Sequence, residues 1–127
     1  MTPELDRQLC DAYPKIFIDR HGDPQKTLMC FGFECEDGWF RIIEDLCYTL
    51  QHHADVRGTT QAVAVQVKEK FGTLRFYADG LDDYGNGAVA YAELLSGRTC
   101  ETCGAGGIYR SGRWIRTLCD PCAERKP

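Results

Sequence analysis

The sequence of 127 residues predicts an α+β fold, with a small body of helices and a β-hairpin followed by a distinct C-terminal module. Three segments place apolar residues at helical spacing, and two neighbouring segments alternate apolar and polar residues as half-buried strands do. The last 30 residues hold two closely spaced pairs of cysteines instead of a continuous apolar pattern. We therefore expect a body over residues 1–97 and a finger over residues 98–127 that packs on it.

The chain begins with a helix signal. Thr2 is suited to the N-cap, Pro3 to the first helical position, and Glu4 places a negative charge in the first turn. Apolar residues follow at helical spacing, and Pro14 ends the run. A helix is expected from about residue 3 to residue 13.

A second helix is expected after Asp37, which is a suitable N-cap. Its apolar face runs from Trp39 to Leu50, and His52 and His53 fall at its C-terminal end, where a cap or surface role is the simplest interpretation. Residues 55–60 then form a predicted linker.

Two alternating segments, Val63–Val67 and Thr73–Tyr77, predict a hairpin. Two strands alone are marginal in water, so we expect them to pack on the helices, with Ile16–Ile18 as a candidate third strand. A last helix is expected from Tyr84 to Leu95, which leads into the cysteine-rich finger.

The finger contains Cys100 and Cys103 in one C-x-x-C pair and Cys119 and Cys122 in a second. Two such pairs at this separation suit four thiolates around one Zn²⁺ ion. A site closed by four cysteines has no open coordination position, so the predicted role of the zinc is structural.

Between the pairs, Ile108–Arg110 and Arg113–Arg116 are joined by Ser111 and Gly112, which predicts a short hairpin. Two cysteine pairs with a hairpin between them make a zinc ribbon. If Cys122 opens a helix through residue 126, the module is a treble clef, and the sequence leaves both alternatives open.

Four further cysteines lie in the body. Cys30, Cys35 and Cys47 allow a second metal site, but they lack a second tight pair, and the alternative is that they fill space in an apolar core. The sequence does not decide between these alternatives.

Two segments are candidate binding surfaces. The first is dense in acids and aromatic residues, namely Glu34, Glu36, Asp37, Trp39 and Phe40. The second is the finger hairpin, where cations and an indole are suited to phosphate contact and base stacking, namely Arg110, Arg113, Trp114 and Arg116.

The net charge of −4 conceals an asymmetry. Residues 1–97 carry 9 Lys/Arg against 16 Asp/Glu, or −7, and residues 98–127 carry 6 against 3, or +3. Zinc with four thiolates contributes −2, which leaves the finger near +1. Charge therefore supports nucleic-acid binding less than the raw count implies.

Neither a membrane span nor a signal peptide is expected, because no apolar run is long enough and the N-terminus lacks a basic region followed by an apolar stretch. We therefore expect a cytoplasmic protein. Reducing conditions there favour thiols and metal over disulfides.

Three separated motifs carry a resemblance: Cys30–Phe40, Val67–Tyr77, and the cysteine pairs with the residues that flank them. Together they resemble a family of small proteins encoded by bacteriophages and prophages. The resemblance covers nearly the whole chain and implies a bacterial host cell as the setting, with no particular reaction. The finger alone is also similar to the zinc fingers of DksA/TraR-type regulators, although those carry acids at the tip of a long coiled coil that is missing here.

Three classes of function follow. The first is a phage accessory protein that binds a host or defence-system protein, for example to inhibit a nucleic-acid enzyme by occupying its basic channel. The second is a nucleic-acid-binding or transcription-associated zinc ribbon. The third is an enzyme, which only residue types support, since no catalytic constellation is evident. We favour the first, and the sequence leaves the partner and the oligomeric state open.

Overall fold

The computed structural model describes residues 1–125, and Lys126 and Pro127 at the end of the predicted finger lie outside the described residues. The fold is mixed α+β, as predicted. The helices are α1 (Pro3–Ala12), α2 (Phe40–Arg57), α3 (Asp83–Ser96) and α4 (Asp120–Arg125), with short 3-10 turns at Met29–Phe31 and Asp37–Trp39. The strands are β1 (Phe33–Glu34), β2 (Val63–Lys70), β3 (Thr73–Asp79), β4 (Ile108–Arg110) and β5 (Arg116–Leu118).

The body contains a three-stranded sheet in the order β1-β2-β3. Strands β2 and β3 form the predicted antiparallel hairpin. Its turn places both Phe71 and Gly72 at positive φ, 53° and 84°, as the two central residues of a tight hairpin turn require.

The third strand is not where the sequence predicted it. Strand β1 pairs parallel to β2, with Phe33 opposite Val67, whereas Ile16–Ile18 lies in a turn. Ile16 still meets the sheet, because its carbonyl accepts a hydrogen bond of 2.8 Å from the N–H of Ala64. The segment is therefore held by burial of Ile16 and by this bond.

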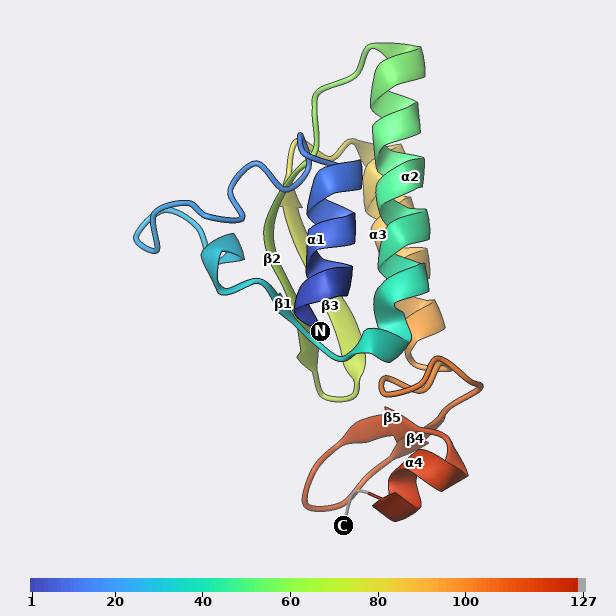
Figure 1. Cartoon of the computed structure of the whole chain (residues 1–127). Helices are drawn as coiled ribbons and strands as arrows, with labels where there is room; N and C mark the ends of the chain where they lie inside the picture. Colours follow the sequence, from blue (N-terminus) through green and yellow to red (C-terminus); the bar gives the residue numbers. More distant parts are fainter. Residues whose placement is uncertain (126–127) are drawn as a thin grey trace.

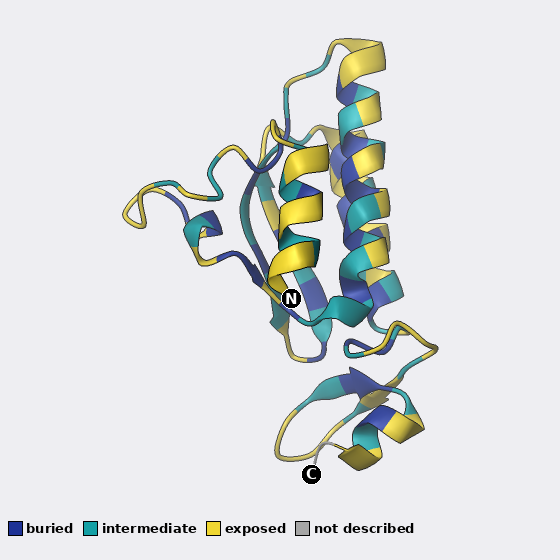
Figure 2. Ribbon diagram, in the orientation of Figure 1, coloured by how far each residue is buried: buried dark blue, intermediate teal, exposed yellow. Residues whose placement is uncertain are grey.

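Helices α2 and α3 lie side by side along the sheet, and the finger lies at the end of the body where α2 begins and α3 ends (Figure 1). Buried faces of the helices and of the sheet point toward one another (Figure 2). The largest fully buried side chains of this core are those of Trp39, Leu9, Ile16, Met29, Ile43 and Leu74. Over residues 1–125, no helix is long and apolar enough to cross a membrane.

The bounds of α2 differ from the prediction at both ends. Asp37 opens a 3-10 turn instead of capping the α-helix, which begins at Phe40. The helix continues through the predicted linker to Arg57 and ends at Gly58, whose φ of 65° lets its N–H reach the carbonyl of Ala54 at 2.9 Å.

Helix α3 begins at Asp83, close to the predicted start. The Asp82 side chain accepts a hydrogen bond from the N–H of Gly85 at 2.8 Å, which caps the helix. His53, at the end of α2, lies 2.8 Å from the same carboxylate and stacks on Tyr84, with 4.1 Å between ring centroids. His53 thus joins the ends of two helices, in keeping with a cap or surface role.

An ion pair between Asp6 and Arg20 links α1 to the following loop. Arg20 Nη2 lies 2.8 Å from Asp6 Oδ2, and Arg20 Nη1 donates to the carbonyl of Cys30 at 3.1 Å. Burial by itself raises the pKa of Asp6, but the hydrogen bonds and charge of Arg20 outweigh it and lower that pKa below its ordinary 3.8.

Replacing Asp6 by Asn is expected to lower the free energy of unfolding by about 1–3 kcal/mol at pH 7, because Arg20 loses a charged acceptor in a partly buried site. A carboxyl with a lowered folded pKa stabilises the fold above pH 3.8, and this contribution is lost as the pH falls through the folded pKa. Urea unfolding of variant and wild type at pH 7 and near pH 2 measures both the loss of stability and its dependence on pH. An equal difference between variant and wild type at the two pH values would contradict the assignment.

Candidate metal centre and its junction with the body

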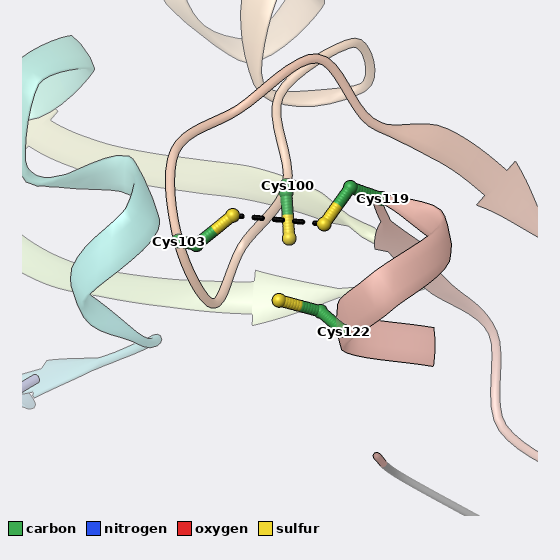
Figure 3. Close-up of side chains that lie close together, drawn as sticks. All are labelled: Cys100, Cys103, Cys119 and Cys122. Atoms are coloured by element: carbon green, nitrogen blue, oxygen red, sulfur yellow. Dashed lines mark hydrogen bonds between the residues drawn. The ribbon is translucent and has the colours of Figure 1, made fainter. Parts of the chain in front are cut away.

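The four cysteines of the finger converge on one point. Cys100 and Cys103 come from the loop after α3, Cys119 follows β5, and Cys122 lies in α4 (Figure 3). Their sulfur atoms all lie within 4.8 Å of one another, and Cys103 Sγ is 3.6 Å from Cys119 Sγ. The two pairs predicted from the sequence are therefore assembled into one cluster.

The geometry suits one tetrahedral metal ion. With a Zn–S bond of about 2.3 Å, tetrahedral sulfurs lie roughly 3.8 Å apart, close to the separation of Cys103 and Cys119. The finger has little apolar core of its own, since its buried apolar residues are Leu118, Cys100 and Cys122, of which two belong to the cluster. An ion bound by all four thiols would supply the missing core.

The surroundings of the cluster shift the pKa values of two of its thiols in opposite directions. Burial raises the pKa of Cys100, but backbone hydrogen bonds from Cys119, Cys103 and Thr102 outweigh it and lower that pKa to about 6. Hydrogen bonding to Cys119 and the other thiols, together with burial, raises the pKa of Cys122 to about 12. Four crowded sulfurs lose their last proton with difficulty unless a cation is present, which is the behaviour expected of a metal site.

Helix α4 decides between the two zinc architectures that the sequence left open. Cys122 lies in the first turn of α4, and Cys119 is the one residue between β5 and this helix. A cysteine loop, a hairpin and a helix that carries a ligand make a treble-clef arrangement. Gly104, with a φ of 84°, turns the chain back after the first pair, and its N–H donates to the carbonyl of Cys100 at 2.9 Å.

The hairpin of the finger has a longer loop and a later second strand than predicted. Strand β4 spans Ile108–Arg110 as expected, but β5 spans Arg116–Leu118 and pairs Arg110 with Arg116. Arg113 and Trp114 therefore lie in the connecting loop and are exposed, Trp114 by 76%. The predicted tight turn at Ser111 and Gly112 is part of this longer loop.

The finger docks on the 3-10 turn that precedes α2. The N–H of Gly38 donates to the carbonyl of Glu101 at 2.7 Å. A Cβ atom at position 38 would lie 2.1 Å from the carbonyl oxygen of Cys100 and 2.4 Å from that of Glu101. Only glycine fits here, because the two backbones meet directly beside a residue of the cysteine cluster.

Two further hydrogen bonds join finger and body. The indole Nε1 of Trp39 donates to the carbonyl of Thr99 at 2.9 Å. The hydroxyl of Thr117, which is fully buried, donates to the carbonyl of Gly72 in the β2–β3 turn at 2.7 Å. The finger is thus attached to the body at both the start of α2 and the tip of the hairpin.

Charged groups complete the junction. Arg116 forms ion pairs with Glu36 of the body and, at 3.3 Å, with Glu101 of the finger. Glu101 also accepts the N–H of Glu36 at 3.1 Å. Burial raises the pKa of Glu101, and the charge of Arg116 opposes that rise. Arg116 therefore holds two carboxylates, one from each side of the junction.

These contacts change the interpretation of both predicted binding surfaces. Trp39 is fully buried, so it was wrong to place it on a recognition surface. Phe40 is half-buried, and Asp37 accepts the N–H of Thr2 at 2.7 Å. Glu34 remains exposed on β1, where the amide of Gln66 donates to it at 3.3 Å. Much of the segment from Glu34 to Phe40 therefore forms the surface on which the finger packs.

The basic residues of the finger are also separated. Arg116 is engaged at the junction, and Arg110 pairs with Asp120 at 2.6 Å and donates to the carbonyl of Leu118. Arg113 and Trp114 stay exposed. The structure does not bring the four predicted nucleic-acid contacts into one free surface.

The other cysteines lie apart from the cluster. Cys35 and Cys47 are buried in the body core, and Cys30 Sγ faces the carbonyl of Thr27 at 3.5 Å. Burial, as the largest cause, raises the pKa of Cys35 to about 12. Across residues 1–125, the groups of three or more metal-binding side chains comprise the finger cluster alone.

An apolar cavity that the sequence analysis missed lies between α2 and α3. Its volume is about 590 Å³. On α3, Tyr84, Ala88, Tyr91 and Leu95 line this cavity and recur at spacings of four, three and four residues. That repeat is the sequence signal that reveals the cavity wall.

Comparison with protein-family models, with curated proteins and with solved structures finds no match for the chain.

Proposed function

We propose that this chain is a zinc-binding accessory protein of bacteriophage origin that acts by binding a host or defence-system protein. The four-cysteine cluster carries the zinc part of the proposal, because all four ligands come from the chain and leave no position for a substrate. Zinc would keep the finger folded in the shape that docks on the body. The exposed surface of the body would then bind the partner protein.

Charge supports a protein partner. The body carries −7, and two of the finger's arginines are neutralised by carboxylates of this chain, Arg110 by Asp120 and Arg116 by Glu36 and Glu101. A largely acidic surface repels phosphate and attracts basic protein surfaces, such as the nucleic-acid channel of an enzyme.

The experiment is affinity capture from a bacterial lysate by the zinc-loaded protein, with and without nuclease. A single protein that is retained after nuclease treatment supports the proposal and identifies the partner. Capture that depends on intact nucleic acid contradicts it.

A nucleic-acid-binding finger is the second candidate, and the exposed Arg113 and Trp114 favour it. A cation beside an exposed indole suits phosphate contact with base stacking. Within residues 1–125, Arg110 and Arg116 form ion pairs and Arg113 does not, so Arg113 is the residue that tests this candidate.

Replacing Arg113 by Ala is expected to leave binding to a protein partner within about twofold, since the residue lies exposed on the finger loop and does not line the acidic surface of the body that the proposal invokes. If the finger instead binds nucleic acid, the variant should weaken binding to a single-stranded oligonucleotide and reduce its dependence on salt. Fluorescence anisotropy at two salt concentrations measures this. Steep weakening in high salt, reduced in the variant, would favour the second candidate.

A further inference from the structure

The cavity between α2 and α3 opens on the surface of the body. Its walls include Ile42 and Leu46 from α2 and Ala88, Tyr91 and Leu95 from α3. Its volume of about 590 Å³ lies within the range of about 300–1,000 Å³ that ligand sites occupy. All of its lining residues belong to α2 and α3, and no residue of the finger lines it.

This open cavity, which we call the α2–α3 groove, has a shape that suits another helix. A groove between two packed helices receives a third by the same ridge-and-groove packing, with apolar anchors of the incoming helix spaced three or four residues apart. Gly87 lies in this groove, and a Cβ atom placed there would meet nothing within 4 Å. Tyr84 and Tyr91 are 54% and 62% exposed, although large aromatic side chains favour burial.

The charge around the groove determines which sign of charge the occupant should carry. Arg41, the one cation among the lining residues, forms an exposed ion pair with Glu44 at 3.7 Å, so a carboxylate lies beside it. Asp45 and Asp83 also line the groove, and neither forms an ion pair within the part of the chain that the structure describes. The surrounding body carries −7. A second copy of this chain would bring acid against acid, whereas a basic partner would be attracted.

We propose that the α2–α3 groove binds an amphipathic helix of a partner protein whose apolar face is flanked by Lys or Arg. This inference rests on the proposed function and names its contact surface. The apolar anchors enter the groove over Gly87 and Ala88, and the flanking cations meet Asp45 and Asp83.

The test is selection from a displayed library of helical peptides against the zinc-loaded protein, followed by affinity measurements on the enriched peptides. Gly87→Leu fills the groove without a clash at its Cβ, and leucine favours the helix over glycine. Asn86→Leu places the same side chain one position away, on an exposed site outside the groove, and is the matched control.

Enriched peptides should combine apolar residues at helical spacing with Lys or Arg on the flanks. Their dissociation constants should rise by about tenfold or more with Gly87→Leu and by less than about twofold with Asn86→Leu. Asp45→Lys should weaken the same peptides, most clearly at low salt. Failure to enrich such peptides, or equal effects of the two leucine variants, would overturn the proposal.

Sedimentation of the free protein tests the alternative that a second copy of this chain fills the groove. A dimer that Gly87→Leu dissociates would mean that a second copy fills the groove, and would also overturn the proposal. Lysate capture that survives Gly87→Leu would leave the proposed function standing while removing the groove from it, so the two failures are distinguishable.

Discussion

Replacing Cys103 by Ser is expected to release the metal and unfold the finger while the body stays folded. The finger's buried apolar set consists of Leu118 and two cysteines of the cluster, so without the ion it has almost nothing to bury. Structural zinc contributes about 10–16 kcal/mol to the folding of comparable small modules. The body has a separate core built around Trp39, Ile43 and Leu74.

Hydrogen exchange measured by mass spectrometry checks this expectation. Residues 98–125 should lose most of their protection in the variant or after chelation, while α2, β2 and β3 keep theirs. Elemental analysis should find about one zinc ion per chain in the wild type and none in the variant. Cys30→Ser is the matched control, because Cys30 lies outside the cluster. This variant should keep both the metal and the protection of the finger. Equal loss of protection in body and finger would show that they unfold as one unit.

Replacing Gly38 by Ala is expected to separate the finger from the body without removing the metal. The new Cβ would lie 2.1 Å from the carbonyl oxygen of Cys100, and the obstacle is backbone, which cannot move aside as a side chain can. Overpacking of this kind costs about 1–3 kcal/mol or more. The hydrogen bonds of Gly38 and Trp39 to the finger should be lost with it.

Tryptophan fluorescence and hydrogen exchange measure the separation, since the environment of Trp39 changes when Thr99 no longer accepts its indole N–H. Zinc content should stay at one per chain. Gly106→Ala is the control, because a Cβ at that finger glycine meets nothing within 4 Å. A Gly38→Ala protein with the stability and exchange of the wild type would contradict the docking described here.

The accuracy of the sequence predictions depended on how local the signal is. Helix α1 begins at Pro3, as the capping signal indicated, and the β2–β3 hairpin follows the alternating pattern. The third strand was misplaced because a two-residue strand, Phe33–Glu34, has no periodicity of its own and is defined only by its pairing with β2. The end of α2 was placed early because residues 55–60 were predicted to be a linker, although the first helix breaker in that segment is Gly58.

The binding surfaces were misjudged for a related reason. Trp39 and the acids near it resemble an exposed recognition segment in sequence, but Trp39 is buried and Glu36 pairs with Arg116, 80 residues further along the chain. Sequence patterns report the polarity of a segment and its local periodicity. They do not report which distant segment covers it.

The sequence by itself determined the α+β class, the main helices and hairpin, and the four cysteines that form one cluster, because each depends on spacing within a few residues or on a repeated pair. Only the tertiary structure decided that the finger rests on Gly38, that Arg116 joins Glu36 to Glu101, and that α2 and α3 leave an apolar groove. The physical reason is that these features arise from contacts between segments far apart in the chain, whose steric fit and charge pairing exist only after the chain has folded.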